Sequence, residues 1–141
     1  CGNLKSLNSN CVCSSKKYDQ ICVVESLADM WVIQNAGIYN GHYHILGGTL
    51  PSFENQKNGN GLLIDSLVNR VKKNSIKEVI LATSASIEGE TTSHYISDSL
   101  KDTKAKITRL AKGVPVGGEI EFLDDGTLYS AFKNRNPIVS D

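Results

Sequence analysis

The chain has 141 residues, 40% of them hydrophobic, and its fifteen basic and fifteen acidic side chains give a formal net charge of zero. This length suits one compact domain with a small additional segment and excludes two full domains, while the composition excludes a disordered, a collagen-like or a membrane-embedded chain. A neutral chain does not bind nucleic acid through its overall charge, so any contact with DNA has to come from a local patch.

The N-terminal segment contains all four cysteines of the chain, the last of them at position 22, and is otherwise polar. It begins at Cys1 without the basic and apolar regions of a signal peptide, so we expect a processed or truncated N-terminus. Residues 1–17 have too few apolar side chains for a core of their own, and a structural zinc ion with thiolate or imidazole ligands would replace that core. Disulfide bonds and free reduced thiols are the alternatives.

Three of the cysteines are candidate zinc ligands: Cys1, Cys11 and Cys13. A structural zinc site takes four ligands, so one is missing. If Cys1 is the second member of a Cys-x-x-Cys pair, the fourth ligand lies upstream of the present start. Cys22 lies instead in the apolar run Ile21-Cys22-Val23-Val24, where a cysteine usually behaves as a small buried hydrophobic residue.

From Gln20 onward, apolar runs of strand length alternate with helical periodicity, which predicts an α/β domain with a mainly parallel sheet. Strands are expected at residues 21–25, 43–46, 78–83 and 106–110. The third of these runs is apolar on both faces and is therefore expected at the centre of the sheet. Loops are expected at residues 49–60, 84–90 and 113–118, and an edge strand at residues 119–123.

Helices are expected between and after these strands. Ser26 caps the first, which ends at Ala36-Gly37 and carries Leu27, Met30 and Trp31 on its buried face. The apolar faces of the next two consist of Ile64, Leu67, Val68 and Val71, and of Tyr95, Ile96, Ser99 and Leu100. The last helix, capped by Asp124 or Asp125, uses Leu128, Ala131 and Phe132.

Carboxylates follow two of the expected strands at their carboxyl ends, where open α/β sheets bind ligands. Glu25 ends the first strand, and Glu88 and Glu90 follow the third, within the segment 84–90. If the three carboxylates converge, they hold Mg²⁺, which prefers oxygen ligands. In the alternative interpretation Glu88 and Glu90 begin a helix, whose N-terminal dipole favours acidic residues without a metal.

Other patterns do not indicate catalysis. Ser93 and His94 are adjacent on an expected helix and point apart, so they do not form a hydrolase triad with Asp98. His42 and His44 face the same side of a strand without a third metal ligand nearby, which favours a structural or surface role. The sequence contains no Gly-Lys-Ser or Gly-Lys-Thr, so it lacks the phosphate-binding loop of a nucleotide hydrolase.

These segments, in this order, resemble the RecR family of bacterial recombination mediators. The resemblance lies in Ile21-Cys-Val-Val-Glu25, Tyr43-His-Ile-Leu-Gly-Gly48, Glu78-Val-Ile-Leu-Ala-Thr83, Glu88-Gly-Glu-Thr-Thr92 and Thr108-Arg-Leu-Ala-Lys-Gly-Val-Pro-Val-Gly-Gly118. It implies a partial four-cysteine zinc module at residues 1–19 and a C-terminal strand and helix segment at 119–141. Between them it implies a Rossmann-like Toprim domain at residues 20–118, with four mainly parallel strands flanked by helices.

The resemblance also implies a function. Members of this family work with RecF and RecO in DNA repair in the bacterial cytoplasm, at the nucleoid. They help to load recombinase onto single-stranded gaps coated by SSB, and they form ring-like oligomers that encircle DNA. The family's N-terminal helix-hairpin-helix segment, which carries much of the DNA contact, is absent from this sequence, so we expect weak DNA binding by this chain.

The family's zinc ligands match the cysteines of this sequence only in part. Cys1 corresponds to the second cysteine of the family's first pair, and Cys13 to the second of its last pair. The sequence reads Cys11-Val12-Cys13 where the family usually has Cys-x-x-Cys, so the loop has to turn differently at Cys11.

Toprim enzymes such as topoisomerases and primases use a strand-end Glu and an Asp-x-Asp pair to hold Mg²⁺. Glu25 matches the Glu, but the Asp-x-Asp position reads Ser84-Ala85-Ser86, and hydroxyls do not replace two negative charges. We therefore expect a non-enzymatic protein in which Glu25, Glu88 and Glu90 form an acidic surface for a basic partner such as RecO. The alternative is a Mg²⁺-dependent Toprim nuclease that uses the same three carboxylates.

Overall fold

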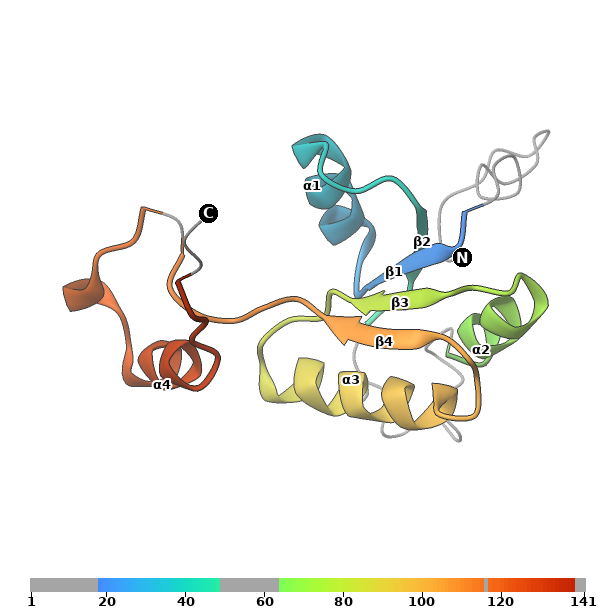
Figure 1. Ribbon diagram of the computed structural model, residues 1–141. Helices are drawn as coiled ribbons and strands as arrows, with labels where there is room; N and C mark the ends of the chain where they lie inside the picture. Colours follow the sequence, from blue (N-terminus) through green and yellow to red (C-terminus); the bar gives the residue numbers. More distant parts are fainter. Residues whose placement is uncertain (1–17, 49–63, 116, 139–141) are drawn as a thin grey trace. The chain divides into compact units, whose positions relative to one another are not determined.

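The computed structural model describes residues 18–48, 64–115 and 117–138. The chain divides after Arg109 into two compact units. The first contains a sheet of four parallel strands in the order β2-β1-β3-β4, shown in Figure 1. The strands are β1 (Gln20–Val24), β2 (His42–Ile45), β3 (Glu78–Leu81) and β4 (Lys106–Arg109). The predicted four-stranded parallel sheet is therefore confirmed, with β1 and β3 inside it.

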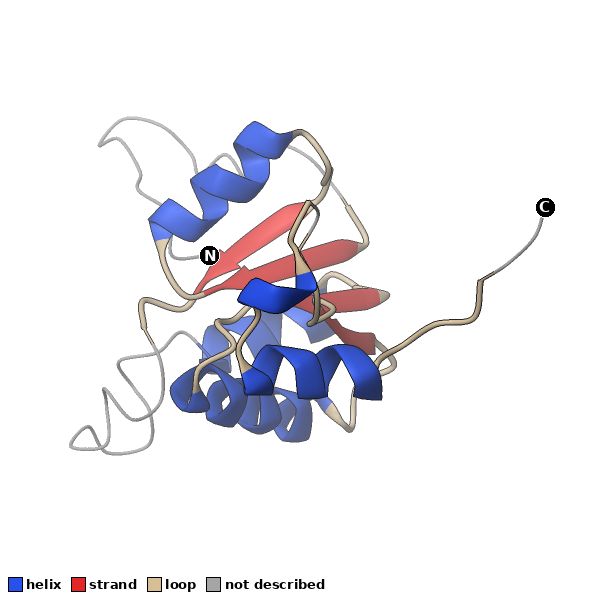
Figure 2. Ribbon diagram, turned by 90° about the vertical axis from the view of Figure 1, so that its left-hand side faces the viewer, coloured by secondary structure: helices blue, strands red, loops and turns tan. Residues whose placement is uncertain are grey.

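Helices cover both faces of this sheet. Figure 2 shows α1 (Leu27–Ala36) on one face, and α2 (Ile64–Lys73) and α3 (Ile87–Leu100) on the other. The second unit contains the short 3-10 helix η4 (Ile120–Phe122) and α4 (Asp125–Lys133). In the part of the chain that the structure describes, none of the helices is both long and apolar enough to cross a membrane.

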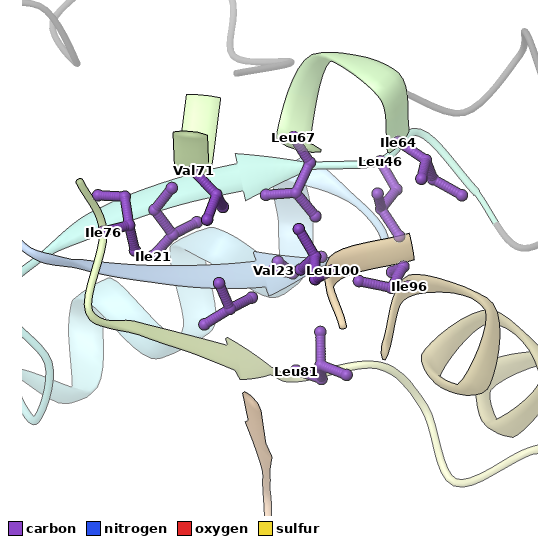
Figure 3. Packing of buried hydrophobic residues seen from close by; sticks show 11 residues of the cluster. Ile21, Val23, Leu46, Ile64, Leu67, Val71, Ile76, Leu81, Ile96 and Leu100 are labelled. Atoms are coloured by element: carbon purple, nitrogen blue, oxygen red, sulfur yellow. The ribbon is translucent and has the colours of Figure 1, made fainter. Parts of the chain in front are cut away.

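Strand β1 supplies side chains to two separate hydrophobic clusters because alternate residues of a strand point to opposite faces. Ile21 and Val23 pack with residues of α2 and α3, as the close view in Figure 3 shows. Cys22 and Val24 face the other way and pack with Met30 of α1. A strand buried on both faces has to be apolar along its whole length, which explains the uninterrupted run from Ile21 to Val24.

Side-chain caps fix where the helices begin and end. The Ser26 hydroxyl accepts a hydrogen bond from the Asp29 amide at 3.3 Å, and Gly37 ends α1 in the left-handed conformation with φ of 68°. Ser86 accepts from the Gly89 amide at 3.1 Å and begins α3. Asp124 accepts from the Thr127 amide at 3.3 Å and begins α4, so it is Asp124 and not Asp125 that caps this helix.

Two of the expected elements are wrong. Residues 87–90 are not a loop but the first turn of α3, because the Ser86 cap starts the helix earlier than its weak apolar pattern indicated. Residues 119–123 are not an edge strand, since residues 120–122 form η4, in which the Phe122 amide bonds the Glu119 carbonyl at 3.2 Å. The sheet therefore ends at β4.

Three aromatic side chains that were expected on the apolar faces of their helices are exposed. The exposed fraction is 54% for Trp31, 45% for Tyr95 and 68% for Phe132. Helix α1 has apolar residues around most of its circumference, and among them Met30 is the one that is buried. Helix α3 buries a stripe that includes Thr92, Ser93 and Ile96, which displaces Tyr95 to the surface.

Replacement of Gly89 by alanine is expected to destabilise the first unit strongly. A Cβ at this position would lie 2.0 Å from the Ser84 carbonyl oxygen and 2.6 Å from its hydroxyl, so backbone has to move. We expect a loss of about 2 to 3 kcal/mol in the free energy of unfolding, measured by urea denaturation.

Gly37→Ala is the matched control, because a Cβ there would meet no atom within 4 Å and only the positive φ opposes it. We expect a smaller loss of about 1 kcal/mol. Equal losses for the two variants would contradict the close approach of Ser84 to α3.

Candidate functional site

The ends of β1 and β3 lie side by side at the carboxyl edge of the sheet. Their parallel register pairs Val23 with Leu81, and the Ala82 amide continues the ladder by bonding the Val23 carbonyl at 2.8 Å. On the other side of β1 the Gly47 amide bonds the Glu25 carbonyl at 3.0 Å. The backbone of Glu25 is thus held from the β2 side, which leaves its side chain directed toward the connection that follows β3.

Glu25 is tied to this connection by a hydrogen bond. A carboxylate oxygen of Glu25 accepts from the Ser84 backbone amide at 2.8 Å. The hydroxyls of Ser84 and Ser86 lie 2.6 Å apart, and the Ser86 hydroxyl also caps α3. The carboxylate therefore satisfies a backbone donor that lies outside the sheet ladder, and it holds the β3–α3 connection against the end of β1.

Glu88 and Glu90 lie in the first turn of α3. The partial positive charge at a helix N-terminus stabilises acidic side chains without a metal ion. Glu88 is exposed and forms no ion pair with the residues that the structure describes. Glu90 is partly buried, and its Oε2 lies 3.0 Å from Nη1 of Arg109 at the end of β4. The helix interpretation of these two residues is therefore confirmed.

The geometry does not assemble the magnesium site that the sequence offered as an alternative. Across residues 18–48, 64–115 and 117–138, no group of three or more histidine, cysteine, aspartate or glutamate side chains is placed to hold a metal ion. One oxygen of Glu25 already accepts from the Ser84 amide, and Glu90 has Arg109 as its partner. All three carboxylates belong to this edge of the sheet, but they act on different neighbours.

The candidate zinc ligands Cys1, Cys11 and Cys13 lie outside the described residues. Cys22 is described, and it is 3% exposed in the cluster between the sheet and α1. Burial raises the pKa of its thiol to about 11, which disfavours the thiolate that binds zinc. Cys22 is thus a buried hydrophobic residue, as its apolar surroundings predicted, and it does not fit as a fourth zinc ligand.

Two contacts at this edge were not predicted from the sequence. The ion pair of Arg109 with Glu90 joins residues of β4 and α3. The hydroxyls of Thr83 and Ser93 form a short hydrogen bond that joins the end of β3 to the middle of α3. The contact of Arg109 could have been predicted, because the carboxyl ends of all parallel strands meet at one edge of the sheet. The contact between two neutral hydroxyls could not, because it does not alter the hydrophobic pattern of the sequence.

Comparison with known proteins matches this arrangement over nearly the whole chain. The family described as Toprim domain matches residues 19–111, and the family described as RecR, C-terminal, matches residues 113–136. Recombination protein RecR of Pelagibacter ubique is 60% identical, in an alignment that covers 98% of this chain and 68% of the relative.

Two further relatives of the same name agree. Recombination protein RecR of Sinorhizobium medicae is 46% identical, with 98% of this chain and 69% of the relative covered. That of Neorickettsia sennetsu is 45% identical, with 98% and 71% covered. With a Toprim-family sheet, a matching C-terminal segment and relatives of this identity, the chain belongs to the RecR family of recombination proteins.

Proposed function

We propose that this chain is a non-enzymatic mediator of DNA recombination and repair. In this proposal it works with RecF and RecO in the bacterial cytoplasm, at the nucleoid, and helps to load recombinase onto gapped single-stranded DNA. Membership of a family of recombination proteins supports the recombination role. One observation supports the non-enzymatic role above all: the Glu25 carboxylate binds the backbone of a connection, Ser84-Ala85-Ser86, that offers no second carboxylate.

The partner surface of this proposal is the acidic edge formed by Glu25, Glu88 and Glu90. Glu88 is exposed on the first turn of α3, so its charge is available to a basic partner such as RecO. Glu90 is held by Arg109, which fixes the position of its carboxylate. Complementary charge across an interface accelerates association and sets the register of binding. Homo-oligomer formation, and DNA binding that is weak in this chain, complete the proposal.

A structural zinc ion is proposed for the N-terminal segment, bound by Cys1, Cys11 and Cys13. Thiolates at a structural zinc site contribute directly to folding, which suits a segment with few apolar residues. The buried position and raised pKa of Cys22 argue that the fourth ligand is another residue.

Reversal of two charges at the acidic edge is expected to weaken binding to RecO. The variant Glu88→Lys with Glu90→Lys replaces attraction by repulsion, and we expect at least a tenfold rise in Kd, about 1.4 kcal/mol, in a pull-down or calorimetric titration. The matched control is Asp98→Lys with Asp102→Lys, which makes the same change of charge at exposed positions near the other end of α3. Equal Kd values for both variants and the unchanged chain would contradict the proposed surface.

The nuclease alternative is tested with Mg²⁺ and single-stranded or nicked DNA. We expect no cleavage, because the carboxylates do not form a metal site among the described residues. Glu25→Gln is the informative variant, since the glutamine oxygen still accepts from the Ser84 amide and keeps the connection in place. Cleavage that this variant abolishes would replace the mediator function by the nuclease function.

Metal analysis tests the zinc proposal. We expect zinc that is labile or below one ion per chain, because three of the four ligands are proposed from this sequence. We expect Cys22→Ala to leave the zinc content unchanged, since Cys22 is buried in the sheet. One firmly bound zinc ion per chain that Cys22→Ala releases would contradict this assignment.

A further inference from the structure

The amino edge of the sheet, opposite the acidic edge, is rich in lysine. Two segments lie at this edge, at the right of Figure 1: residues 72–77, from the last turn of α2 to the residue before β3, and residues 101–106, from the end of α3 to the first residue of β4. Together they contain six lysines and a single aspartate, and two further carboxylates lie at this edge, Asp19 just before β1 and Glu78 at the start of β3. The segment 84–90 at the other edge contains two glutamates and no basic residue, and Arg109 at the end of β4 pairs with Glu90 there. The chain is neutral overall, but lysines predominate at one edge of its sheet and carboxylates at the other.

A cleft of about 400 Å³ is lined by residues of these two lysine-rich segments and by Val71 of α2. Its polar lining consists of Lys72, Ser75, Lys77, Thr103 and Lys104. The three lysines come from three different positions in the fold: the last turn of α2, the residue before β3 and the connection before β4. Three ammonium groups around one cleft repel one another, so a bound anion would relieve an unfavourable arrangement.

Most of this positive charge is not used by the described part of the fold. Lys77 Nζ lies 3.8 Å from Asp19 Oδ2, but the side chains are 81% and 60% exposed, so the pair contributes little. Lys72 and Lys104 form no ion pair with any described residue. The negative end of the α2 dipole accounts for Lys72 in its last turn. It does not account for Lys77 or Lys104, which lie beyond the ends of the helices.

The lining of the cleft indicates what kind of anion fits. Val71 and Ile76 form its apolar floor, but they are only 3% and 4% exposed. The fold therefore covers most of these two side chains, while the three exposed lysines give the cleft a positive charge that attracts an anion. A nucleic acid binds more tightly to such a site because its closely spaced phosphates release condensed counterions on binding. The separate carboxylates of a peptide contribute less binding free energy.

We propose that the cleft bounded by Lys72, Lys77 and Lys104 binds backbone phosphates of single-stranded DNA. The choice of DNA as the polymer rests on the proposed recombination function. In this arrangement the amino edge of the sheet faces the DNA. The acidic edge lies at the opposite end of the strands and stays accessible to a basic protein.

The test is the salt dependence of binding to a fluorescently labelled oligothymidylate, followed by anisotropy. Lys72→Gln with Lys104→Gln is expected to lower the affinity about tenfold at low salt. Loss of two phosphate contacts should also reduce the slope of log K against log salt by about 1.4. Both side chains are exposed, and an unchanged urea midpoint will confirm that the variant folds.

Lys112→Gln with Lys133→Gln is the control, because it removes the same charge from two residues that do not line the cleft. Equal losses in both double variants would overturn the proposal, since overall charge would then explain binding. Competition by polyglutamate as strong as that by oligothymidylate of equal charge would also overturn it and assign the cleft to an acidic protein. Binding to RecO, measured on the same variants, is expected to stay unchanged. If the Lys72→Gln, Lys104→Gln variant changes neither RecO binding nor the salt dependence of oligothymidylate binding, the proposed DNA site is wrong and the mediator function stands.

Discussion

The burial of β1 on both faces is the constraint on which the rest of the first unit depends. Ile21 and Val23 require α2 and α3 on one side, and Cys22 and Val24 require α1 on the other. Because β2 and β3 both pair with β1, the same strand also sets the register of its neighbours. Its last residue is followed by Glu25, so the side chain that organises the carboxyl edge is positioned by the most buried strand of the sheet.

Stability and recognition use the same charges in this fold. In a parallel sheet with helical crossovers, helix N-termini gather at the carboxyl edge and C-termini at the amino edge. Glu88 and Glu90 therefore stabilise the start of α3, while Lys72 and Lys73 stabilise the end of α2. The zero net charge of the sequence hides this separation, because a count of charges contains no information about the edge on which each one lies.

The sequence predicted the sheet well, since β1 to β4 differ from the expected ranges by one or two residues and the two inner strands, β1 and β3, are short apolar runs. The first residues of helices whose start depends on a single capping side chain were harder to predict. The start of α3 rests on Ser86, and the segment after it contains Gly89 and two threonines, which resemble a loop. At residues 119–123 the alternation of Ile120 and Phe122 imitates a strand, but this segment does not pair with the sheet. In the site, Glu25 was placed correctly at the edge, whereas its bond to a backbone amide 59 residues away follows only from the folded chain.

The reactivity of the buried Cys22 thiol measures how often α1 separates from the sheet. Alkylating reagents and oxidants attack thiolates, and this sulfur is both protonated at neutral pH and enclosed between β1 and α1. It becomes reactive only in molecules in which the helix has left the sheet, so its modification rate follows the frequency of that opening.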